Sequence, residues 1–180
     1  MTKLSVLVAM SAAALAASTA ARSEDLRARL IGYQEVPAVS TVARGEFQGQ
    51  ISSDDQFIDY ELTFSGLQGD VRQSHIHVAQ KSVNGGIVIW LCQTSFNPGP
   101  AGTQTCPQSG TIRGTIRASD VVAITGANAA QQITAGELAE VLAAIRAGVA
   151  YTNVHTSLSA GGEIRGQLRA SRKDRDRDRD

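Results

Sequence analysis

The three histidines of this 180-residue chain lie in two short segments that have the composition of β-strands. His75 and His77 are separated by one residue, and His155 lies much further along the chain. A strand turns residues i and i+2 to the same face, so His75 and His77 are predicted to point the same way. A His-x-His pair joined by a third histidine is a ligand set that suits copper or zinc. The spacing therefore predicts a candidate metal site, and the alternative interpretation is a polar outer face of a sheet.

The segment with His155 is followed by a turn and by a second strand-like segment with further polar residues. If His155 pairs opposite Glu163, then Asn153 lies opposite Arg165, and all four residues share one face. Glu163 is then a candidate metal ligand, or a carboxylate that orients His155. Asn153 and Arg165 are predicted to surround the ligands. The structural alternative is a cross-strand ion pair between Glu163 and an arginine.

Cys92 and Cys106 are the only cysteines, and the segment between them contains proline and glycine. In an oxidising compartment an isolated pair is expected to form a disulfide. Closing a loop of this length is worth about 3 kcal/mol in the chain-entropy model. In the alternative, one thiolate joins two histidines in a blue-copper-like site, which would leave the other cysteine reactive in an exported protein. We therefore expect a Cys92–Cys106 disulfide.

The two ends of the chain have compositions unlike that of the middle. Residues 1–21 have the pattern of a secretory signal, with Lys3, an apolar run and then small residues. We therefore expect an exported protein, periplasmic or secreted, and no later segment is apolar for long enough to be a transmembrane segment. Residues 171–180 end in alternating Asp and Arg, which predicts a disordered charged tail. The formal net charge of +0 argues against nucleic acid as a partner.

Residues 25–170 are long enough for one domain, and most of this region alternates apolar and polar residues between turn signals. The expected strands are Leu26–Gly32, Ala43–Ile51, Phe57–Phe64, Arg72–Ala79, Gly86–Leu91, Gly110–Arg117, Val149–His155 and Glu163–Arg169. One segment differs, because a capping box at Thr134 and Glu137 precedes apolar residues at helical spacing from Leu138 to Ile145. The pattern predicts an all-β fold, an antiparallel β-sandwich of about eight strands with one short inserted α-helix. A partly closed β-barrel is the alternative.

Several short motifs occur in a fixed order along this region. They are Gln34-Glu35-Val36-Pro37, Ser74-His75-Ile76-His77, Gly85-Gly86-Ile87-Val88, Tyr151 to Thr156 and Gly161 to Gln167. In these motifs the chain resembles the chordin-type (CHRD) domain family from about Leu26 to about Leu168. The resemblance implies a β-sandwich in a small exported bacterial protein, and in animals the domain occurs in chordin, an extracellular antagonist of growth factors. A looser similarity to copper-zinc superoxide dismutase fails because three histidines cannot supply both of its metal sites.

The sequence contains no recognisable set of nucleophile, base and acid, since Ser74 and His75 are adjacent and so face opposite sides of a strand. A non-enzymatic role is therefore favoured over an enzymatic one. The first hypothesis is an exported, non-catalytic binding or structural module for an unidentified protein or envelope partner, with no certain cofactor. The alternative is a mononuclear copper or zinc domain that uses His75, His77 and His155.

Overall fold

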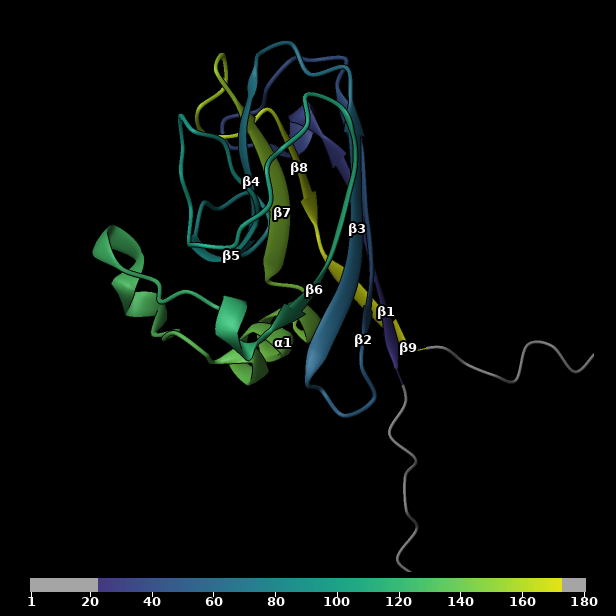
Figure 1. Ribbon diagram of the computed structural model, residues 1–180, viewed down its shortest axis with the longest axis vertical. Helices are drawn as coiled ribbons and strands as arrows, with labels where there is room; N and C mark the ends of the chain where they lie inside the picture. Colours follow the sequence, from purple (N-terminus) through teal and green to yellow (C-terminus); the bar gives the residue numbers. More distant parts are fainter. Residues whose placement is uncertain (1–22, 173–180) are drawn as a thin grey trace, which may run out of the picture.

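A computed structural model describes residues 23–172 of the chain (Figure 1). The predicted signal segment, residues 1–21, lies outside the described residues, as do residues 173–180 of the predicted tail. Within residues 23–172, none of the helices has the length and apolar character needed to cross a membrane.

The described region is an antiparallel all-β fold with one short α-helix, which confirms the predicted fold class. The strands are β1 (Glu24–Ile31), β2 (Arg44–Ile51), β3 (Phe57–Ser65), β4 (Val71–Val78), β5 (Gly86–Cys92), β6 (Gly110–Arg117), β7 (Ala150–Thr156), β8 (Ile164–Gln167) and β9 (Arg169–Arg172). The first eight correspond to the eight expected strands, with ends that differ by a few residues.

The strands follow one hydrogen-bonded path in the order β5-β4-β7-β8-β1-β2-β3-β6. The path bends between β8 and β1, so that β5, β4, β7 and β8 form one layer and β1, β2, β3 and β6 the other (Figure 1). A single bridge between Ile89 and Val121 brings the two ends of the path together, so the sheet is nearly closed. The core between the layers includes Phe47, Ile58, Leu62, Phe64, Ile76 and Val154, all at most 1% exposed.

Strand β9 was not expected from the sequence, and it reaches into the predicted tail. Strand β8 pairs with β7, and the next segment, β9, pairs instead with β1. In this pairing Asp25 lies opposite Ser171 and Glu24 lies opposite Arg172. The physical reason is that β8 pairs with β1 only at Ile31, so the rest of that edge of β1 has free backbone groups. Residues 171 and 172 are therefore part of the sheet and not of a disordered tail.

Helix α1 (Leu138–Arg146) packs its predicted apolar face inward, with Leu138, Val141, Leu142 and Ile145 buried. The expected start was wrong, because Glu137 and not Thr134 is the residue that precedes the first turn. The Glu137 carboxylate does accept a hydrogen bond from the Thr134 backbone N–H, at 2.7 Å. Gly136, however, has a φ of +87°, which no right-handed helix can contain. Three 3-10 helices complete the fold: η1 (Gly32–Gln34), η2 (Ala118–Asp120) and η3 (Gly126–Gln131).

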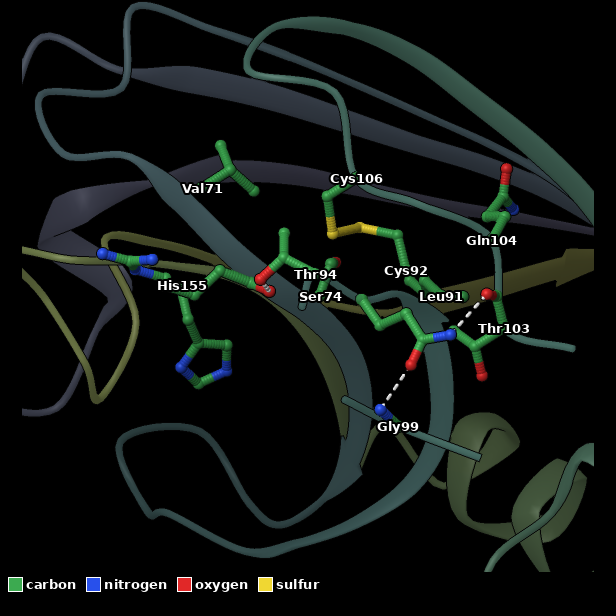
Figure 2. The surroundings of a disulfide bond; sticks show 12 residues. Val71, Ser74, Leu91, Cys92, Thr94, Gly99, Thr103, Gln104, Cys106 and His155 are labelled. Atoms are coloured by element: carbon green, nitrogen blue, oxygen red, sulfur yellow. Dashed lines mark hydrogen bonds between the residues drawn. A yellow bond between two sulfur atoms is a disulfide. The ribbon is translucent and has the colours of Figure 1, made fainter. Parts of the chain in front are cut away.

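The Cys92–Cys106 disulfide is present, with a Cα–Cα distance of 4.9 Å, so this prediction is confirmed. Inside the loop that it closes, the Gln93 side chain accepts a hydrogen bond from Gly99 N–H and donates one to the Thr103 carbonyl (Figure 2). Gly99 lies against Trp90, and a Cβ atom added at Gly99 would come within 2.4 Å of the indole ring. The glycine therefore allows the loop to pack closely on Trp90.

A candidate metal site on the outer face of the β4–β7 pair

Strands β4 and β7 are neighbours, and their register brings the three histidines to one face. In this register His75 pairs with Asn153, His77 with Tyr151, and Gln73 with His155. Paired residues share a face of the sheet. Because Ile76 and Val154 belong to the core, the histidines lie on the outer face of their layer. The predicted pairing of Asn153 with Arg165 is also present between β7 and β8, and Tyr151 pairs there with Gln167.

Although this is an outer face, the histidine rings are buried. His75 is 0% exposed, and His77 and His155 are each 6% exposed. The ring of Trp90, from the edge strand β5, packs edge-on against His75 with a centroid distance of 4.2 Å. The turn before β5 and the turn between β7 and β8 contact the other two rings through main-chain carbonyls. The site is therefore enclosed by turns and by an aromatic side chain, and not by the opposite layer.

The three rings converge. One nitrogen from each of His75, His77 and His155 can be chosen so that all lie within 4.8 Å of one another. Nδ1 of His75 and Nε2 of His155 are 3.2 Å apart. Ligand bonds of 2.0 to 2.1 Å to one ion place neighbouring nitrogens about 3.4 Å apart. The His75–His155 separation fits this value, whereas a pair as far apart as 4.8 Å must draw closer before one ion can bond all three rings.

Two of the histidines are oriented by main-chain carbonyls. Nδ1 of His77 lies 3.0 Å from the Gly85 oxygen, and Nδ1 of His155 lies 2.9 Å from the Ala160 oxygen. A carbonyl oxygen can only accept a hydrogen bond, so in each neutral ring Nδ1 carries the hydrogen and Nε2 carries a lone pair. Metal-binding histidines typically have this arrangement. Nε2 of His77 and Nε2 of His75 have no hydrogen-bond partner among the described residues.

Burial keeps the three rings neutral. It lowers the pKa of His75 to about 2, with smaller effects from His155 and His77. Burial also lowers the pKa of His77 to about 4, although the hydrogen bond to Gly85 opposes the shift. The pKa of His155 is lowered by the same cause, and the hydrogen bond to Ala160 opposes it. A neutral imidazole is the form that binds a metal.

Arg165 lies behind His77, with the Tyr151 ring between them. Its guanidinium lies 3.4 Å from the centre of the Tyr151 ring, and Tyr151 stacks on His77 with a centroid distance of 4.7 Å and an interplanar angle of 1°. Arg165 also donates hydrogen bonds to the carbonyls of Gln80 and Val83 and to Asn84 Oδ1. These bonds hold the turn whose next residue, Gly85, orients His77.

Asn153 lies next to His155, with its Oδ1 atom 3.0 Å from His155 Nε2. An amide oxygen and an unprotonated imidazole nitrogen both present lone pairs, so this contact is favourable when a proton or a cation lies beside it. Asn153 therefore contacts the histidine group.

Glu163 is not a member of the converging histidine group and has another set of partners. Its carboxylate accepts hydrogen bonds from the hydroxyls of Thr41 and Thr156, each at 2.8 Å. It also accepts bonds from the backbone N–H groups of Gln68 and Gly69, at 2.8 and 3.3 Å. Burial alone would raise the pKa of Glu163, but these hydrogen bonds outweigh it and hold the pKa below its usual value. Within residues 23–172, no ion pair links Glu163 to an arginine, and the carboxylate instead joins three loops.

The sequence analysis missed Glu35 as part of this region, although it quoted the motif that contains it. Glu35 is 5% exposed, and its Oε1 atom has no hydrogen-bond partner among the described residues. Burial raises the pKa of Glu35 to about 7, and the charge of Arg165 and hydrogen bonding from Asn153 only partly offset this. A Cβ atom added at Gly162, where φ is +124°, would lie 2.1 Å from Glu35 Oε1. The sequence signal that could have indicated Glu35 is its place as an acidic residue in the short motif Gln34-Glu35-Val36-Pro37.

The fold and the site together define a class: an antiparallel β-sandwich with a buried histidine cluster on the outer face of one layer. Residues 26–168 match the family model of the CHRD domain, and the chain belongs to this family. This confirms the resemblance drawn from the motifs. Comparison with curated proteins and with solved structures gives no significant match.

Proposed function

We propose that this protein is an exported metal-binding CHRD domain in which His75, His77 and His155 hold one copper or zinc ion. The observation that carries the proposal is the orientation of His77 and His155. Each donates its Nδ1 hydrogen to a main-chain carbonyl and so keeps an unprotonated Nε2, and one nitrogen of each of the three rings lies within 4.8 Å of the others. A module that only presented a binding surface would not require three buried imidazoles to converge.

The energetic cost of the cluster without a metal supports the same conclusion. Nε2 of His75 and Nε2 of His77 are buried polar atoms with no partner among residues 23–172. Leaving such an atom unsatisfied costs about 1–3 kcal/mol. A bond to a metal ion would replace the hydrogen bond that Nε2 of His77 loses on burial, so metal binding should stabilise the folded protein.

A route for the ion is also available. A cavity of about 210 Å³ borders His155 and is lined further by Arg72, Gln73, Asn97, Thr156, Ser157 and Ala160. His155 is the histidine of the three that lines this cavity, which makes it the ligand that an incoming ion would meet first.

Export is part of the proposal, and the disulfide supports it, since such bonds persist in oxidising compartments. We place the protein in the periplasm or outside the cell, and expect Edman sequencing of the exported form to begin after residue 21. A non-catalytic binding or structural role toward a protein or envelope partner is compatible with the metal site, because the ion could stabilise the module itself.

The experiment is a metal analysis of tag-free protein, followed by copper and zinc titrations. Trp90 is the chain's single tryptophan and packs on His75, so its fluorescence should report binding. We expect one ion per chain and a higher melting temperature with metal.

Two variants sharpen the assignment. His77→Asn and His155→Asn keep a side-chain N–H that can bond to the Gly85 or Ala160 carbonyl, but they remove the Nε2 ligand. Both should lose stoichiometric binding, whereas Gln48→Ala, on the exposed face of β2, should retain it. Folded wild-type protein that binds neither copper nor zinc would end the proposal.

A further inference from the structure

We infer that this site selects monovalent copper over divalent zinc. The inference rests on the proposed function, since it concerns which ion the same three histidines hold. It depends on three observations: the charge of the ligands, the charge of their surroundings, and the cover over the rings.

The ligands are uncharged. The group that converges contains three neutral imidazoles and, among the described residues, no carboxylate or thiolate. Glu163 accepts four hydrogen bonds elsewhere, and both cysteines are in the disulfide. The cost of transferring an ion into a buried site rises with the square of its charge, so a divalent ion without an anionic ligand is penalised far more than a monovalent one.

The surroundings place a cation beside one of the ligands. The buried carboxyl Glu35 interacts with the guanidinium of Arg165, and the two charges offset one another when Glu35 is ionised. Arg165 is also separated from His77 only by the Tyr151 ring, so a positive charge lies behind one of the ligands. A second positive charge on the ion is therefore repelled further.

The cover over the rings favours three ligands. Zinc generally takes four ligands, and with three histidines the fourth is a water or hydroxide. Trp90 covers His75, and Tyr151 covers His77, while the cavity of about 210 Å³ borders His155 alone among the three. Cu(I) and Zn(II) both have filled d shells, and Cu(I) is satisfied by three ligands. The geometry and the charge therefore point to the same ion.

The test compares these two closed-shell ions on the full mature protein. Dissociation constants are measured by competition with a chromophoric Cu(I) chelator under anaerobic reducing conditions, and with a fluorescent zinc chelator. We expect the wild type to bind Cu(I) more tightly than Zn(II). Zinc binding as tight as Cu(I) binding would overturn the inference but leave the proposed metal site in place. If neither ion binds to folded protein, the proposed function itself fails.

Two variants isolate the charge argument. Asn153→Asp places a carboxylate beside His155 Nε2, and its attraction to a divalent ion is twice its attraction to a monovalent one, so the preference for Cu(I) should fall by about tenfold or more. If the new carboxyl must lose a proton before an ion binds, that cost is the same for Cu(I) and Zn(II). It therefore cancels in the ratio of the two dissociation constants. Measured above pH 7, where Glu35 is ionised, Glu35→Gln removes the negative charge that offsets Arg165 and should raise the preference for Cu(I). Gln48→Glu adds a charge on β2 and should not change it. An unchanged ratio in both site variants, if folded by circular dichroism, would overturn the inference.

Discussion

The two layers of the sandwich present outer faces with the same alternation of polar residues, but these faces have different environments. On β3 and β6, Arg113 pairs with Glu61 at 2.7 Å, and their side chains are 68% and 41% exposed. On β4, β7 and β8, His75, Asn153 and Arg165 are at most 1% exposed. The difference is that turns and the Trp90 side chain cover the second face. The alternation of the sequence thus decides which face of the sheet a residue lies on. The turns between the strands decide whether that face is shielded from solvent.

The two environments predict different effects of substitutions on the free energy of unfolding. Exposed polar pairs exchange one set of hydrogen bonds for another with water, so each contributes little. Buried polar groups have lost water and depend on their partners, so removing one partner is expensive. Substitutions on the covered face should therefore be several times more destabilising than matched substitutions on the exposed face.

The largest effect is expected for Glu163→Ala. This change removes the acceptor of four hydrogen bonds and leaves the donors on Thr41, Thr156, Gln68 and Gly69 without it. We expect a loss of about 4 kcal/mol in the free energy of unfolding. Urea denaturation of the metal-free protein measures it. A loss below about 1 kcal/mol would show that the loops do not depend on the carboxylate.

The next effect concerns the disulfide loop, which packs on Trp90 at the rim of the covered face. Replacing both Cys92 and Cys106 with alanine should cost about 3 kcal/mol, because the unfolded chain regains the entropy of an open loop. The fluorescence of Trp90 should shift as Gly99 loosens from it. Wild-type stability in the double variant would mean that the loop holds its place without the bond.

The covered face should also give stability a particular pH dependence through Glu35. Its pKa is about 7 in the folded protein against 4.5 for the ordinary group. Between these values the unfolded chain releases the proton while the folded protein keeps it, so stability falls as pH rises. The loss should reach up to about 3 kcal/mol above pH 7.

Glu35→Gln cannot ionise, so the difference between wild-type and variant denaturation curves at pH 4 to 8 isolates this group from the histidines. A difference that does not change with pH would contradict the account of Glu35.

The smallest effect is expected on the exposed face. Glu61→Ala removes the partner of Arg113 and should cost less than about 1 kcal/mol, since the pair is solvated and screened. High salt should reduce even this difference. If Glu61→Ala proved as damaging as Glu163→Ala, the contrast between the two faces would be wrong.

Much of this arrangement could be predicted from local sequence patterns. Alternation located eight strands, and the pairing of Asn153 with Arg165 followed from counting residues across one turn. The shared face of His75 and His77 followed from the period of a strand. The predicted helix start was wrong because the capping pattern of Thr134 and Glu137 does not reveal that Gly136, between them, has a left-handed backbone conformation.

The remaining features depend on contacts between segments far apart in the chain. The partners of Glu163 include Thr41 and Gln68, whose loops no local pattern brings together. The burial of Glu35 requires the loop that contains Gly162. Strand β9 formed because β1 had a free edge, which only the complete sheet order reveals.

The most direct test of the central claim is a crystal structure of the metal-loaded protein, with anomalous scattering recorded at the metal's absorption edge. The account predicts one ion, bonded at about 2.0 to 2.1 Å by Nε2 of His77, Nε2 of His155 and one nitrogen of His75. Nδ1 of His77 and of His155 should keep their contacts with the Gly85 and Ala160 carbonyls. An ion bound at Glu163, or a histidine ring turned to bind through Nδ1 at either of these two positions, would contradict it.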